Sequence, residues 1–321
     1  MKKTLLALVI PAMFASSANA YDFYQTDDLK LSVKGQMEIQ YIQKLTPSSS
    51  EKGPEMRFDD GEVEFKVKAN LGNDVSAISS LRTEFKSNDV EDGGTIKLDR
   101  YYVGLEYGGS QLIFGRMKTF GDWYGTNDDQ ELGQWFWNTP TKGDDVIRYM
   151  YYGENFWFGV DADLQEKTSD GSTDTSLVET IANVDIGPVT LQGFYSIGEY
   201  PTLVEADQNT QAKSTSGGAE WKTFWGHAVY NYKDLSFAGG YGEEEYDDVV
   251  TEMIQATITY KMGDMRTMVG YSQLDTDGQK ASDNYFANVI YKFHPNMKAY
   301  VEVANQTDMD FAYLAGMEVS F

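Results

Sequence analysis

The 321-residue sequence has no cysteine and only two histidines, and both shortages exclude classes of protein. Without cysteine, neither a disulfide nor a thiolate metal site can stabilise the fold. A hydrolase needs a base held beside its nucleophile. His227 falls inside a predicted strand and His294 in a predicted turn, and no metal-spaced cluster or glycine-rich phosphate loop accompanies them. We therefore expect no catalytic residues, no metal and no cofactor.

Basic residues and long apolar runs are also scarce. Lys and Arg number 26 against 50 Asp and Glu, so the formal net charge is −24. This balance argues against a nucleic-acid partner, because phosphate binding needs a basic surface. Beyond the amino terminus, no run of about 18 apolar residues could form a membrane-spanning helix.

Residues 1–20 have the organisation of a secretory signal peptide. Lys2 and Lys3 precede the apolar stretch Leu5 to Phe14, and Ala18-Asn19-Ala20 supplies small residues for cleavage. The stretch is too short to serve as a membrane anchor. The mature, exported chain is predicted to be residues 21–321 and to carry a net charge of −26, since cleavage removes two lysines.

The mature chain alternates apolar and polar residues in short runs, which is the pattern of half-buried β-strands. In the first run, Leu31, Val33 and Ile39 lie on one face and Lys34 and Gln40 on the other. The predicted strands are 30–41, 62–71, 75–86, 95–107, 111–116, 146–152, 156–165, 178–186, 189–198, 219–232, 235–243, 252–262, 265–273, 284–293, 297–306 and 311–321.

An even number of strands, about sixteen, with tight turns alternating with longer polar loops, predicts an all-β, membrane-spanning antiparallel barrel. A soluble β-sandwich has no reason to sort its connections by length. Tyrosines also concentrate near both ends of the strands, as in the two aromatic belts of an outer-membrane barrel. The expected location is the outer membrane, with its lipid and lipopolysaccharide as partners.

Three segments resemble the general porin family of Gram-negative bacteria. Residues 311–321, which end in Phe321, resemble the signal read by the barrel-assembly machinery. Residues 99–105 with 114–116 resemble the strands before the family's constriction loop, and residues 146–149 resemble the strand after it. The resemblance implies a sixteen-stranded homotrimeric channel whose third external loop folds inward.

The loop from 118 to 145 is acidic and aromatic, lacks strand alternation, and is the third external loop in this reading. We expect it to narrow the pore, with acidic side chains opposite a basic wall, so that a transverse field acts on solutes. The predicted acidic residues are Asp122, Asp128, Asp129 and Glu131. The predicted basic residues are Lys34, Lys66, Lys68, Arg82, Arg100 and Arg116.

Two of these positions carry specific expectations. Alternation would point Arg116 at lipid, so we expect a bulge or strand end at Gly115 that turns it inward. Glu64 lies where the family usually has a basic residue, which favours a cation-leaning pore. Asp144 and Asp145 could line the pore or merely lie at the outer rim.

The loop aromatics Trp123, Tyr124, Trp135 and Trp137 leave two interpretations open. The rings either pack against the barrel wall or present flat faces on which sugars stack, as in an oligosaccharide-selective channel. A further alternative is a non-conducting barrel that serves as a surface receptor or adhesin.

Overall fold

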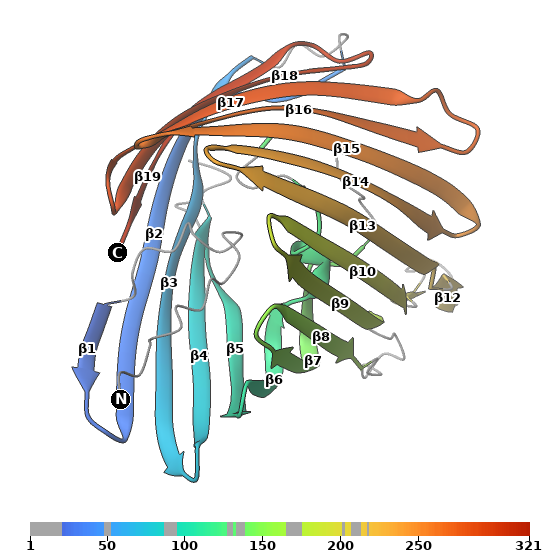
Figure 1. Cartoon of the computed structure of the whole chain (residues 1–321). Helices are drawn as coiled ribbons and strands as arrows, with labels where there is room; N and C mark the ends of the chain where they lie inside the picture. Colours follow the sequence, from blue (N-terminus) through green and yellow to red (C-terminus); the bar gives the residue numbers. More distant parts are fainter. Residues whose placement is uncertain are drawn as a thin grey trace.

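The computed structural model describes residues 21–47, 53–86, 95–126, 131–132, 139–164, 175–200, 203–206, 213–216 and 218–321. Sixteen antiparallel strands form a closed barrel, as predicted (Figure 1). Strands adjacent in sequence pair with each other around the wall, and the last strand returns to pair with the first barrel strand. Among the described residues, no helix is long and apolar enough to cross a bilayer.

The barrel strands lie close to the predicted ranges. They are β2 (Leu29–Gln43), β3 (Glu55–Gly72), β4 (Val75–Lys86), β5 (Thr95–Tyr107), β6 (Ser110–Lys118), β7 (Lys142–Tyr152), β8 (Phe156–Asp163), β9 (Ser176–Ile186), β10 (Val189–Glu199), β13 (Glu220–Tyr232), β14 (Leu235–Tyr246), β15 (Val249–Met262), β16 (Met265–Thr276), β17 (Ser282–His294), β18 (Met297–Gln306) and β19 (Ala312–Ser320).

Three short strands were not predicted, because four or five residues are too few to show a period. β1 (Tyr21–Gln25) pairs with β2 outside the ring of sixteen. β11 (Leu203–Ala206) and β12 (Lys213–Ser216) form a separate hairpin between β10 and β13.

The two faces of the wall differ in the way that the alternation predicts. Along β13, Thr223 and Trp225 are buried, whereas Phe224 and Tyr230 are 39% and 44% exposed. Exposed apolar side chains recur in this way on the outer face of every barrel strand for which burial is described. The outer face is therefore the apolar one, and the polar side chains of the strands point to the interior.

One external connection is shorter than predicted. β14 and β15 continue in register up to Tyr246 and Val249 and are joined by Asp247 and Asp248, whose φ angles are 49° and 65°. Positive φ at both central residues matches the twist of a two-residue hairpin. The expected loop over 244–251 was wrong because the acidic run Glu243 to Glu245 hides the strand period.

The barrel closes through the carboxyl-terminal residue. Gly35 on β2 and Phe321 exchange two backbone hydrogen bonds of 2.8 and 2.9 Å. The Phe321 ring lies over Gly35, where a β-carbon would come within 2.5 Å of the ring and 2.7 Å of the Glu62 carbonyl oxygen. Gly35 therefore lets the terminal ring seal the joint between β19 and β2.

We predict that Gly35→Ala weakens this joint. Overpacking a tight contact costs about 1–3 kcal/mol, so the barrel should unfold at lower urea concentration in detergent micelles. Gly193→Ala is the control, because a β-carbon there has no neighbour within 4 Å. Equal unfolding midpoints for the two variants would contradict the assigned role of Gly35.

Candidate pore-lining site

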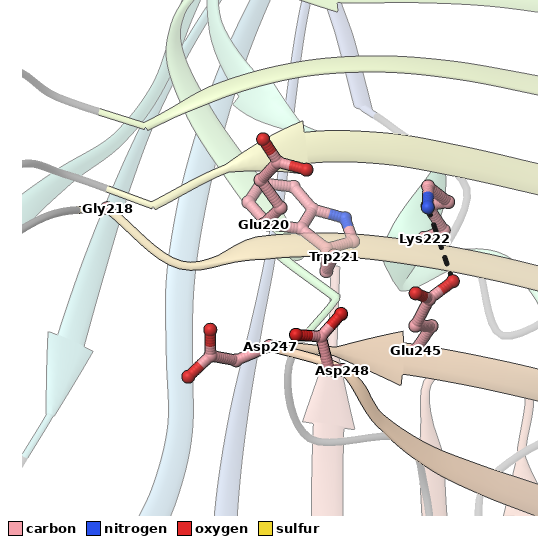
Figure 2. Close-up of a pocket in the computed structure, with 7 residues that line it drawn as sticks. All are labelled: Gly218, Glu220, Trp221, Lys222, Glu245, Asp247 and Asp248. Atoms are coloured by element: carbon pink, nitrogen blue, oxygen red, sulfur yellow. Dashed lines mark hydrogen bonds and ion pairs between the residues drawn. The ribbon is translucent and has the colours of Figure 1, made fainter.

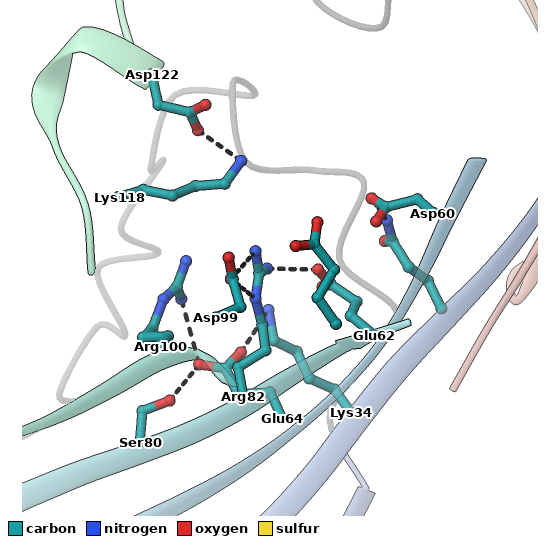
Figure 3. Close-up of polar contacts among 12 residues, drawn as sticks. Lys34, Asp60, Glu62, Glu64, Ser80, Arg82, Asp99, Arg100, Lys118 and Asp122 are labelled. Carbon is teal, nitrogen blue, oxygen red and sulfur yellow. Dashed lines mark hydrogen bonds and ion pairs between the residues drawn. The ribbon is translucent and has the colours of Figure 1, made fainter. Parts of the chain in front are cut away.

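Inward-facing residues of β2 to β5 form a charged group centred on Glu64 (Figure 3). The Glu64 carboxylate is fully buried. It lies 3.0 Å from Lys34 Nζ, 3.7 Å from Lys66 Nζ and 3.3 Å from Arg100 Nη1. Ser80 donates a further hydrogen bond of 2.5 Å to it. Three of the predicted wall cations therefore share one carboxylate that the sequence flagged as a departure from the family pattern.

Arg82 is neutralised by two carboxylates beside this group. Its guanidinium lies 2.5 Å from Glu62 on β3 and 2.5 Å from Asp99 on β5. Lys142, at the start of β7, also contacts Asp99. Asp99 is the extra residue where the β4–β5 register shifts, and such a bulge re-aims a side chain. The wall from β2 to β5 thus carries alternating charges and not an unopposed row of cations.

The remaining two predicted wall cations lie apart from the Glu64 group. Lys68 contacts Glu106 nearer the short-turn end of the wall. Arg116 is paired in register with Tyr101, whose ring is exposed on the outer face. It forms an ion pair with the exposed Asp144 of β7.

The expected irregularity next to Arg116 is present, but its effect differs from the expectation. The β6–β7 register shifts between Gly115 and Met117, and Gly115 has a φ of 133°. The extra residue lies on β7, so the alternation of β6 is not reset and Arg116 keeps its outward register. A charge near the end of a strand costs only about 0–1 kcal/mol on the outer face.

Arg148 on β7, which sequence reasoning did not select, fixes the start of the long loop. Its side chain is 3% exposed and donates to Asp161 (3.0 Å) and to the Lys118 carbonyl (2.7 Å). The guanidinium carbon lies 4.1 and 4.8 Å from the ring centroids of Phe120 and Trp123. Its place on the polar face of a strand was visible in the sequence, but its burial beneath two loop rings was not.

The described parts of the loop hydrogen-bond to inward-facing side chains of four strands. In chain order, Gly121 N donates to Glu179 of β9 (3.1 Å), Thr126 Oγ1 to Gln255 of β15 (3.2 Å), Leu132 N to Glu302 of β18 (2.6 Å) and Thr139 Oγ1 to Glu244 of β14 (2.9 Å). Each acceptor residue is at most 2% exposed. These segments therefore lie against the interior wall at widely separated strands.

The acidic loop residues do not converge on the Glu64 group. Asp122 pairs with Lys118 of the same segment at 2.8 Å, and Figure 3 shows these two side chains pointing toward one another. Glu131 lies 3.6 Å from Arg57 of β3. Asp128 and Asp129 lie outside the described residues.

Glu131 instead joins an acidic cluster on the opposite part of the wall. Carboxylate oxygens of Glu38, Asp59 and Glu131 lie within 4.8 Å of one another. Burial, and next the Asp59 carboxylate, raise the pKa of Glu131 above its ordinary value, against a lowering effect of Arg57. This cluster is a second, acidic lining of the interior that the sequence did not predict.

Two of the four aromatic loop residues are described, and both pack against other rings. Tyr124 is 7% exposed and stacks on Phe194 of β10, with centroids 4.6 Å apart and planes inclined by 12°. Trp123 meets Phe120 edge-on at 5.0 Å. Trp135 and Trp137 lie outside the described residues.

A cavity of about 310 Å³ opens at the loop end of β13 and β14 (Figure 2). Its lining is mostly acidic and includes the ion pair of Lys222 with Glu245, whose N–O distance is 3.3 Å. The lining residues are Gly218, Glu220, Trp221, Lys222, Glu245, Asp247 and Asp248. This cavity lies at the rim of the barrel, away from the contacts that hold the long loop.

Comparisons with known proteins agree with this architecture. Residues 4–310 match the family model described as Gram-negative porin. Porin-like protein H of Photobacterium profundum is 26% identical over the full length of both chains. Two solved structures share the fold. They are a loop L8 deletion mutant of OmpT of Vibrio cholerae (TM-score 0.75, 15% identity, 92% of this chain and all of that one) and in-vitro folded OmpT in its trimer form (TM-score 0.72, 14% identity, 92% and 99%).

We predict that Glu302→Ala releases the middle of the loop. The Glu131 and Leu132 amides both donate to Glu302, and a hydrogen bond to a charged acceptor contributes about 1.5–3 kcal/mol. Hydrogen exchange at these two amides should therefore accelerate at least tenfold. Glu318→Ala is the control, since Glu318 pairs with Lys298 within the wall at 2.9 Å. Unchanged exchange in Glu302→Ala would refute the anchoring.

Proposed function

The chain belongs to the Gram-negative porin family, whose members are non-enzymatic diffusion channels of the outer membrane, and we propose that this porin favours cations over anions. The observation that carries the proposal is the buried Glu64 carboxylate among Lys34, Lys66 and Arg100. With Glu62 and Asp99 it offsets most of the positive charge of the wall.

The acidic cluster supports the same preference from the other side of the interior. Glu38, Asp59 and Glu131 bring three carboxylates together beside the guanidinium of Arg57. Rings of carboxylates favour cations in a channel, because they replace part of the ion's hydration shell and raise its local concentration. The net charge of −24 over the whole chain has the same sign.

We further propose that the loop from 118 to 145 sets the narrowest part of the channel. Its support is the set of hydrogen bonds from described loop residues to β9, β14, β15 and β18. A loop tied to widely separated strands crosses the interior and reduces the space for solutes. Asp128 and Asp129 remain candidates for its acidic edge.

The assembly and export of the chain are proposals of the same kind. A homotrimer is supported by the family and by the trimer form of the related fold. Residues 1–20 are proposed to be a cleaved leader, and Phe321 to be read by the barrel-assembly machinery. The Phe321 ring over Gly35 gives that residue a second role in closing the barrel.

A sugar-stacking loop receives less support than ring packing. The face of Tyr124 is occupied by Phe194, and Trp123 meets Phe120 and Trp157 edge-on. A ring whose face is covered by another ring cannot also offer it to a sugar. We therefore propose that Trp123 and Tyr124 anchor the loop.

We predict that Glu64→Gln shifts the permeability ratio toward anions. A unit charge about 6 Å from an ion in water is worth about 0.7 kcal/mol, or roughly a threefold change in permeability ratio. Reversal potentials in a salt gradient across a planar bilayer measure this ratio directly. The glutamine has the size of glutamate, so the barrel should keep its conductance.

Asp308→Asn is the matched control, because Asp308 is exposed at an external turn and pairs with Lys280. Salt screens such a charge within about 10 Å at 0.1 M, so its removal should leave the reversal potential nearly unchanged. A wild-type channel that prefers anions, or a Glu64→Gln channel with wild-type selectivity, would overturn the proposal.

A further inference from the structure

Two carboxyl groups are buried behind the start of the long loop. Asp161 on β8 and Glu179 on β9 are direct cross-strand partners, and their side chains face the interior. They are 1% and 0% exposed. Their carboxyl groups lie within hydrogen-bonding reach of one another.

The other partners of these two groups are unequal. Asp161 Oδ2 accepts from the Arg148 guanidinium (3.0 Å), and Glu179 Oε2 accepts from the Gly121 backbone amide (3.1 Å). The second oxygen of each group, Asp161 Oδ1 and Glu179 Oε1, is buried and has no hydrogen-bond donor within the described part of the chain. Two acceptors without donors thus occur on adjacent residues that touch.

Among the described residues, the surrounding groups do not supply a second positive charge to the pair. Arg148 of β7 forms the ion pair with Asp161. On β10 the cross-strand neighbour of Glu179 is Ser196, which is uncharged, and the loop contributes the Gly121 amide and the buried Tyr124 ring. Two ionised carboxylates would leave one buried negative charge uncompensated, which costs several kcal/mol. One proton between them removes that cost and gives both free oxygens a partner.

We propose that Glu179 carries a proton and donates it to Asp161, and that the resulting hydrogen bond makes Glu179 a positioning residue for the first turn of the loop. The proton belongs on Glu179, because Asp161 is held ionised by Arg148. Neutral Glu179 then accepts from Gly121, while Arg148 stacks on Phe120 and binds the Lys118 carbonyl. One hydrogen-bonded chain therefore joins β7, β8 and β9 to residues 118–121.

The consequence for permeation depends on the proposed role of the loop as the constriction. Loss of the shared proton places a second negative charge behind Gly121 and removes the bond between the two acids. Residues 118–121 then lose part of their support, and the loop should fluctuate more. In a conducting pore such motion is recorded as current noise and brief closures.

The first test uses infrared difference spectroscopy on the folded protein in detergent at neutral pH. The wild type should show the C=O stretch of a protonated carboxylic acid that shifts in D₂O, and Glu179→Gln should lack this band. Asp122→Asn, which alters an exposed loop carboxylate, should keep it. Absence of the band from the wild type, or its persistence in Glu179→Gln, would overturn the proposal. This result needs no ion flow, so a silent channel would count against the proposed function and not against the shared proton.

The second test compares single-channel noise at neutral pH and at about pH 10, where a buried acid can lose its proton. Wild-type closures should become several-fold more frequent at the higher pH. Glu179→Gln should stay quiet at both, because its amide donates a similar bond and does not titrate. Glu179→Ala should be noisy at both. Equal pH dependence in wild type and Glu179→Gln would exclude Glu179 as the group responsible.

Discussion

The structure depends on the closure of its backbone hydrogen bonding. Each barrel strand pairs on both sides, and the pairing of β19 with β2 removes the last free edge of the ring. A bilayer offers no water to an unpaired amide or carbonyl, so only a closed sheet can place strands in it. Once the ring is closed, the two-residue period of a strand assigns every side chain to the outside or the inside. The apolar outer face and the charged interior both follow from this one constraint.

The interior is organised by cross-strand rows. One row runs through Arg148, Asp161, Glu179, Ser196, Thr223 and Glu244, which are successive partners in the register from β7 to β14. All six are at most 3% exposed. This row contacts the loop near both ends, at Lys118, Gly121 and Thr139. The interior therefore has a polar side that holds the loop and, on β2 to β5, a charged side.

The fold could be predicted from the sequence and the pairing of charges could not. Alternation located the sixteen barrel strands, because that pattern is local. It failed at Glu243 to Glu245, where acidic residues occupy both faces of a strand end. It also could not show which carboxylate meets which cation. Glu62 and Asp99 hold Arg82 only because β3, β4 and β5 adopt one register with a bulge at Asp99. Arg116 shows the same limit, since the extra residue lies on β7 and not on β6.

The separation of side chains by parity is tested most directly by spin labels at neighbouring positions. Val67 and Val289 are each 38% exposed on the outer face, and Lys68 faces the interior, where it pairs with Glu106. In reconstituted bilayers, labels at Val67 and Val289 should be relaxed by lipid-soluble oxygen and shielded from a water-soluble nickel complex. A label at Lys68 should show the reverse. A label at Val67 that collides mainly with the nickel complex, or one at Lys68 that collides mainly with oxygen, would contradict the account.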